Sequence, residues 1–283
     1  DEDGREIEGI EIHSTIGFAL DSDQTLRKAT IALKTAKEQD KDYVCYFKGL
    51  NQKEEYATQI ERSKLIQYAT INNNIVPYFQ PIVNDQKVPV KYECLIRLLD
   101  RGDVISPNVF LDISKRIKRY ADLEKQLIVK CFKQLVEDKN LVLSINLSSR
   151  DMIDGDVSSL VLNLLNKHNV AGRVVFEIVE DEELKNLERV SNFIDRVKSM
   201  GAKIAIDDFG SGYSNFSYII KIKPDYVKID GSIIKDIDIN KDSHSIASAI
   251  VAFAKDLGIK TIAEYVHSKE IFEICKEIGV DEF

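Results

Sequence analysis

Cysteine, long apolar runs and excess positive charge are all scarce in this sequence. Its four cysteines among 283 residues form no CxxC pair and no cluster with histidine, which excludes a disulfide framework and a zinc ribbon. Its longest apolar stretch, near residues 245–254, falls far short of the roughly 20 residues that cross a membrane. Lysine and arginine total 39 against 47 aspartates and glutamates, without long basic runs, so we expect no duplex nucleic acid as a partner.

The chain opens with DEDGREIEG, which has no Met, basic region or apolar region typical of a signal peptide. We therefore expect a cytoplasmic piece of a longer protein, with a membrane anchor upstream left open. Residues 1–52 hold two strand patterns and one helical pattern, which is too little for an independent core. We assign residues 1–52 to the end of one domain and residues 53–283 to a second domain.

Short apolar runs alternate with amphipathic stretches from Val76 onward. Strands that are nearly all apolar are typical of parallel sheets covered on both faces. Repeated strand–helix units predict an α/β fold, either a doubly wound sheet or a (β/α)8 barrel. The strand candidates are VPYFQPIV, VKYECLIRL, LVLSINLS, RVVFEIVE, KIAIDDFG, YVKID and KTIAEYV.

Polar residues that can bind metals or move protons interrupt these apolar strands. Most are spaced by about one strand–helix unit, so each returns to the same end of the sheet, where barrel active sites lie. One such residue is readily explained by a local hydrogen bond, but several unpaired charges inside apolar strands would be costly. The residues are Glu93, Asn146, Glu177, Asp207, Asp208, Lys228 and Glu264.

The chemistry of this set favours a hard cation. Carboxylate and amide oxygens without histidine or cysteine select Mg²⁺ or Mn²⁺ rather than zinc. The adjacent Asp207 and Asp208 can place one carboxylate between two ions, and two ions are the usual clamp for attack on a phosphodiester. Lys228 can hold the attacking water, or deprotonate it if nearby cations lower its pKa.

Six strings follow one another along the chain: YFQPIV, YECLIRL, SINLS, FEIVE, DDFGSGYSNFSYI and PDYVKID. Together, in this order and spacing, they make the chain resemble the EAL-domain family of cyclic-di-GMP phosphodiesterases, from about Tyr56 to the end. The resemblance implies a (β/α)8, TIM-barrel-like domain that hydrolyses cyclic di-GMP to linear pGpG. The first 50 residues, through STIGF and LRKATIALKTAK, resemble the closing part of a GGDEF domain; they carry no GGDEF signature, so we assign no cyclase activity.

The resemblance also implies residue roles, two Mg²⁺ or Mn²⁺ ions and a possible homodimer through the EAL domain. It makes Asp208 the bridge to the second metal and Lys228 the residue that activates water. Glu264 falls on a Glu that supports the metal site. The implied ligands of the first metal are Glu93, Asn146, Glu177 and Asp207.

Four further positions match supporting residues of the family. Gln80 and Arg97 match positions that contact the substrate. Asp230 matches a partner near Lys228, and Glu180 matches the Glu that steadies the loop after Asp208.

The sequence departs from the family pattern near its end. Tyr265 stands for a usual Gly and His267 for a usual Glu, which affects the second-metal environment and the local loop shape. The sequence stops at VDEF, where the family continues into another strand and a helix. We therefore expect a barrel with an open strand edge at this point.

Two other functions fit parts of the pattern. A cyclic-di-GMP receptor would keep the pocket without turnover, but such receptors usually lose a carboxylate or the lysine, and this sequence has both. A one-metal lyase of enolase type would also use strand-end acids and a lysine base. The adjacent pair Asp207 and Asp208 suits two metals better than that arrangement does.

Overall fold

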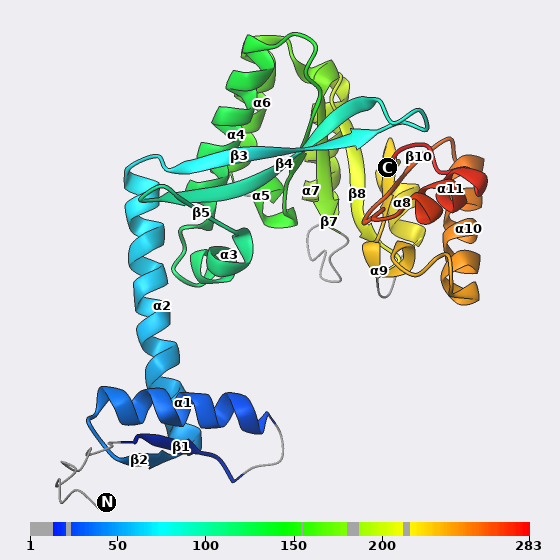
Figure 1. The fold of residues 1–283 in the computed structure, drawn as a ribbon. Helices are drawn as coiled ribbons and strands as arrows, with labels where there is room; N and C mark the ends of the chain where they lie inside the picture. The colour runs from blue at the N-terminus through cyan, green and yellow to red at the C-terminus, as the bar shows by residue number, and fades with distance from the viewer. Residues whose placement is uncertain (1–13, 21–23, 154, 180–186, 212–215) are drawn as a thin grey trace, which may run out of the picture. The chain divides into compact units, whose positions relative to one another are not determined.

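The computed structural model describes residues 14–20, 24–153, 155–179, 187–211 and 216–283 (Figure 1). The chain divides into two compact units, residues 1–65 and residues 66–283. Among the described residues, no helix combines the length and apolar character needed to cross a membrane.

The first unit contains a small parallel pair of strands with one helix against it. β1 (Ile16–Phe18) and β2 (Tyr43–Cys45) pair in parallel, and α1 (Thr25–Glu38) connects them. Helix α1 lies close to β1 at Gly17, where any side chain would overlap the helix backbone at Leu33. A long helix, α2 (Lys48–Ile71), follows and runs into the second unit.

The second unit is built around one curled sheet with the strand order β10-β9-β8-β7-β6-β4-β3. Strands β3 and β4 are antiparallel, and β5 (Asp103–Ile105) pairs with β4. From β4 onward the remaining strands run parallel, as the repeated strand–helix pattern predicts. The strands are β3 (Ile75–Val83), β4 (Pro89–Asp100), β6 (Leu143–Asn146), β7 (Val174–Val179), β8 (Lys203–Phe209), β9 (Tyr226–Ile229) and β10 (Lys260–Ala263).

Helices follow the strands and pack against the outside of the sheet (Figure 1). Helix α4 shows the reason, since Leu123, Leu127 and Cys131 recur every four residues and are buried along one stripe. The strands they cover are nearly all apolar; all of β9 is buried. The helices are α3 (Pro107–Arg116), α4 (Tyr120–Glu137), α5 (Ser149–Ile153), α6 (Gly155–His168), η1 (Ala171–Arg173), α7 (Leu187–Ser199), α8 (Phe216–Ile222), α9 (Gly231–Ile234), α10 (Lys241–Asp256) and α11 (Lys269–Glu277).

Residues 281–283 lie between β10 and β3, where the sequence predicted an open edge. The Ala263 N–H donates to the Glu282 carbonyl at 2.9 Å, and the Glu282 N–H donates to Thr261 at 3.0 Å. On the other side, Val83 and Phe283 exchange two backbone hydrogen bonds of 2.9 Å. The prediction of an unpaired edge was therefore wrong over these residues, because a three-residue segment is enough to bridge both neighbours.

Candidate active site at the carboxyl end of the barrel

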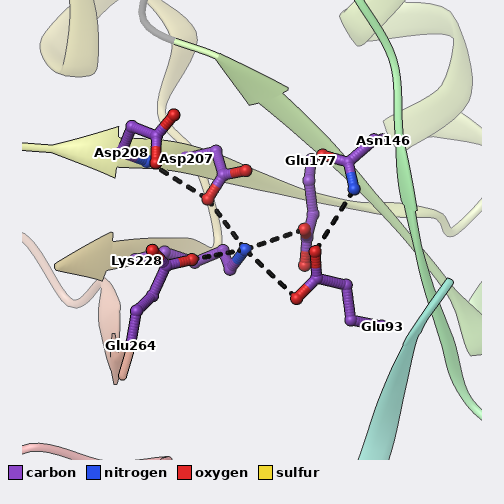
Figure 2. Close-up of polar contacts among 7 residues, drawn as sticks. All are labelled: Glu93, Asn146, Glu177, Asp207, Asp208, Lys228 and Glu264. Atoms are coloured by element: carbon purple, nitrogen blue, oxygen red, sulfur yellow. Dashed lines mark hydrogen bonds and ion pairs between the residues drawn. The ribbon is translucent and has the colours of Figure 1, made fainter. Parts of the chain in front are cut away.

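The seven polar residues predicted from the strand pattern lie together in one cluster (Figure 2). They come from five strands and the residue after a sixth; most stand at or near the carboxyl end of their strand, whereas Glu93 lies within the longer β4. Their positions are Glu93 in β4, Asn146 in β6, Glu177 in β7, Asp207 and Asp208 in β8, Lys228 in β9, and Glu264 directly after β10.

The ammonium group of Lys228 lies at the centre of this cluster and faces four carboxylates (Figure 2). The Lys228 side chain is only 2% exposed. Its Nζ lies 2.7 Å from Asp207 Oδ1, 2.7 Å from Glu264 Oε1, 3.0 Å from Glu177 Oε2 and 3.6 Å from Glu93 Oε2.

These contacts set the protonation of the cluster. Burial by itself lowers the pKa of Lys228, but the four carboxylates outweigh burial and raise the pKa above its ordinary value. Burial raises the pKa of Glu177 to about 7 and that of Glu264 to about 8, although Lys228 opposes both shifts. One ammonium therefore does not compensate all the negative charge gathered here, and further positive charge would be stabilised.

An interruption in the sheet places two adjacent carboxylates in the same region. The pairing of β8 with β9 breaks between Ile206 and Phe209, and Asp208 has a left-handed backbone with φ of 55°. In a regular strand, neighbouring side chains point to opposite faces. Here Asp207, Asp208 and Glu264 each offer an oxygen within 4.8 Å of the others. Burial, with the nearby negative charge of Asp207, raises the pKa of Asp208.

The donor atoms of the cluster fit a hard divalent cation. Besides the oxygens of Asp207, Asp208 and Glu264, the site holds Glu177 Oε1, which is buried and has no hydrogen-bond partner among the described residues. An unpaired buried carboxylate oxygen is costly unless a ligand satisfies it. Asn146 contributes an amide that donates to Glu93 Oε1 at 3.4 Å, so its carbonyl oxygen belongs to the same oxygen-rich set.

A cavity of about 600 Å³ opens next to the cluster. Gln80 lines it and is directly opposite Glu93 in the pairing of β3 with β4. Asp230 also lines it and caps α9 by accepting a 2.8 Å hydrogen bond from the Ser232 N–H. The complete lining is Gln80, Pro81, Ile82, Glu93, Lys228, Asp230, Gly231, Ile262, Ala263, Glu264, Tyr265, Val266, His267 and Phe283.

Two predicted residues lie outside this arrangement. Arg97 is not among the cavity-lining residues; its guanidinium donates to the Ile96 carbonyl at 2.9 Å and lies 5.5 Å from the centre of the Tyr78 ring. Glu180 falls outside the described residues. Conversely, Val266 and Phe283 line the cavity without any signal in the sequence, because their role depends on how the last residues fold back on the barrel.

Comparison with known proteins places the site in a family context. The family model described as "EAL domain" matches residues 64–283. Cyclic di-GMP phosphodiesterase PdeB of Shewanella oneidensis is 26% identical over 96% of this chain and 33% of the relative's length. Cyclic di-GMP phosphodiesterase PdeA of Borreliella burgdorferi is 30% identical over 78% of this chain and 34% of the relative's length. The chain thus spans about a third of these relatives.

Solved structures support the same fold. The EAL domain of Xanthomonas citri FimX in complex with c-diGMP superposes with a TM-score of 0.74 at 23% identity, covering 81% of this chain and 92% of that chain. An EAL domain protein from Listeria monocytogenes superposes with a TM-score of 0.72 at 26% identity, covering 78% of this chain and 90% of that chain.

Proposed function

Because the chain belongs to the EAL domain family, we propose that it hydrolyses cyclic di-GMP to linear pGpG. The observation that carries this proposal is the complete cluster around Lys228, in which all seven expected polar side chains are present and close together. Similar proteins named cyclic di-GMP phosphodiesterases support the choice of substrate.

We assign the metal-binding role to the oxygen donors of the cluster. Bound Mg²⁺ or Mn²⁺, as a pair, would lower the pKa of a water and neutralise charge on the phosphodiester. In this proposal Asp208 would help to hold both ions, and the oxygen of Glu264 lies within 4.8 Å of those of Asp207 and Asp208, where it would support them. The proposed ligands of the first ion are Glu93, Asn146, Glu177 and Asp207.

Lys228 acts on the attacking water in this proposal. Its three N–H donors face Glu177, Asp207 and Glu264, and Lys228 also lines the cavity. Cations bound to these carboxylates would release one donor for a water in the cavity. A hydrogen bond donated to the water oxygen would orient the water toward phosphorus and stabilise hydroxide-like charge on that oxygen. Asp230 holds the start of α9 next to Lys228.

Two further residues would contact the substrate, one in the cavity lining and one outside it. Gln80 lines the cavity and can donate to a phosphate or base. Arg97 would contact a phosphate after its guanidinium leaves the Ile96 carbonyl. The role of Glu180 in steadying the loop after Asp208 stays a prediction from the resemblance, as do the homodimer, the cytoplasmic location and the GGDEF origin of residues 1–52.

Product analysis tests this function against a receptor that binds without turnover. Purified protein should convert cyclic di-GMP to pGpG with Mg²⁺ or Mn²⁺ and lose this activity in chelator. Tight binding without pGpG, even with protein in excess over the nucleotide, would identify a receptor instead. Activity on a carboxylate substrate but not on cyclic di-GMP would revive the enolase-type lyase.

A further inference from the structure

Two aromatic side chains beside the cluster have no part in the hydrolytic chemistry. Tyr265 directly follows Glu264, and its side chain is highly exposed, at 67%. His267 lies next to it, with the two ring centres 5.2 Å apart and the planes inclined by 53°. Both residues line the cavity that also contains Lys228 and Glu264.

The backbone of Tyr265 is held in an unfavourable conformation. Its φ of 56° lies in the left-handed region, where a side chain with a Cβ is disfavoured. Burial of the ring does not compensate this strain, because the ring is mostly exposed. Strain that is kept without a folding benefit is typical of positions that contact a ligand.

Neighbouring residues fix the position of this tyrosine. The Nδ1 atom of His267 lies 3.2 Å from the carbonyl oxygen of Tyr265, within hydrogen-bond distance. Gly231, at the start of α9, leaves space on the other side, since an added Cβ would lie 2.9 Å from the Cβ of Tyr265. His267 thus contacts the backbone of Tyr265 and Gly231 leaves room for its Cβ, while the ring itself stays exposed.

The lining of the cavity therefore combines two chemically different groups of side chains. Glu93, Lys228 and Glu264 are charged, whereas Tyr265 and His267 are aromatic. A ligand that contacts both groups carries an anionic group, bound through cations at the carboxylates, and a flat ring attached to it.

We propose that Tyr265, supported by His267, stacks on one guanine base of the bound nucleotide while a phosphate lies beside Lys228. The inference rests on the proposed function for the identity of the nucleotide. Aromatic rings stack on any base, so Tyr265 supplies affinity and position without taking part in bond cleavage. It is a substrate-binding residue that this chain carries at the edge of the metal site.

The test uses a cyclic dinucleotide in which 2-aminopurine replaces one guanine, since stacking on an aromatic ring quenches the fluorescence of 2-aminopurine. Wild type, Tyr265→Gly and Tyr265→Phe are mixed with the probe in Mn²⁺, and KM and kcat are measured separately with cyclic di-GMP. Tyr68→Leu is the matched control, because Tyr68 is also exposed, at 55%, but does not line the cavity.

Tyr265→Gly should abolish the quenching and raise KM about tenfold, with kcat within about twofold of wild type. Tyr265→Phe and Tyr68→Leu should behave as wild type. Glycine adopts positive φ without strain, so the melting temperature of Tyr265→Gly should not fall, and a weaker KM then reports a lost contact rather than unfolding.

Other outcomes overturn one proposal or both. Unchanged quenching and KM in Tyr265→Gly would overturn the stacking role while hydrolysis stands. Quenching in wild type that Tyr265→Gly removes, without any pGpG formed, would support the stacking role and overturn the hydrolytic function. Failure of the wild-type protein to bind the probe would overturn both.

Discussion

Two buried lysines inside the same barrel differ in how many carboxylates surround them. Lys228 faces four carboxylates, whereas Lys91 pairs with Glu282 and lies 3.6 Å from the centre of the Tyr226 ring. Both side chains are 2% exposed. Lys91 precedes Glu93 by two residues on β4, and Tyr226 precedes Lys228 by two on β9, so the Lys91 pair lies one layer toward the amino end of the strands.

The difference between the two lysines separates a structural pair from a binding site. Burial dominates at Lys91 and lowers its pKa, because Glu282 offsets only part of the desolvation. At Lys228 the surrounding carboxylates dominate and raise the pKa. A one-to-one pair is complete in itself, whereas an excess of carboxylates around one ammonium leaves room for cations.

The largest expected effect on the hydrolysis rate comes from removing a proposed metal ligand from the carboxylate cluster around Lys228. Glu93→Gln should lower the rate of cyclic di-GMP hydrolysis at least about 10³-fold, or about 4 kcal/mol, because a neutral amide replaces a charged ligand poorly. The rate is measured with saturating Mn²⁺. Glu137→Gln, an exposed residue near Lys133, is the control. Retention of more than about a tenth of the wild-type rate would show that Glu93 is not a metal ligand.

Asp208→Asn should separate catalysis from binding. We expect the hydrolysis rate to fall about 10²- to 10³-fold while the dissociation constant for cyclic di-GMP changes far less, because the charge of the nucleophile develops only toward the transition state. Calorimetry gives the dissociation constant and single-turnover kinetics give the rate. Equal losses in both would mean that Asp208 supports the pocket generally.

Lys91→Met should reduce stability rather than chemistry. It leaves the Glu282 carboxylate buried without its partner, which costs about 3 kcal/mol in the free energy of unfolding. Urea denaturation measures this cost, and kcat per folded molecule should stay near wild type. The double variant Lys91→Met, Glu282→Leu should recover most of the loss, since an apolar pair needs no compensation. A loss of kcat in Lys91→Met without a loss of stability would instead mean that the Lys91–Glu282 pair contributes to catalysis at the Lys228 cluster.

Metal binding at the carboxylates around Lys228, and not at the Lys91–Glu282 pair, should stabilise the folded protein. At a free Mn²⁺ concentration 100 times its dissociation constant, the expected gain is about 2.7 kcal/mol. Thermal melts with and without Mn²⁺ measure it. The gain should persist in Lys91→Met and shrink in Glu93→Gln. An identical gain in wild type and Glu93→Gln would mean that the ion binds elsewhere.

The sequence by itself indicated the repeated strand–helix architecture and the polar residues that lie together around Lys228. Apolar runs separated by one strand–helix unit indicated the parallel strands, and that spacing predicted that Glu93, Glu177, Asp207 and Lys228 would gather at one end. This succeeded because the period of a repeated strand–helix unit fixes which end of the sheet a residue reaches. The chemistry of the oxygen donors could also be predicted, since it depends on residue type alone.

Only the tertiary structure decided how those residues face one another. The four carboxylates around Lys228, the interrupted pairing at Asp207 and Asp208, and the bridge formed by residues 281–283 each join segments far apart in the chain. The orientation of Arg97 toward the Ile96 carbonyl likewise depends on local packing. Periodicity assigns a residue to a face or an end, but distances, desolvation and pKa shifts arise only when separate strands are brought together.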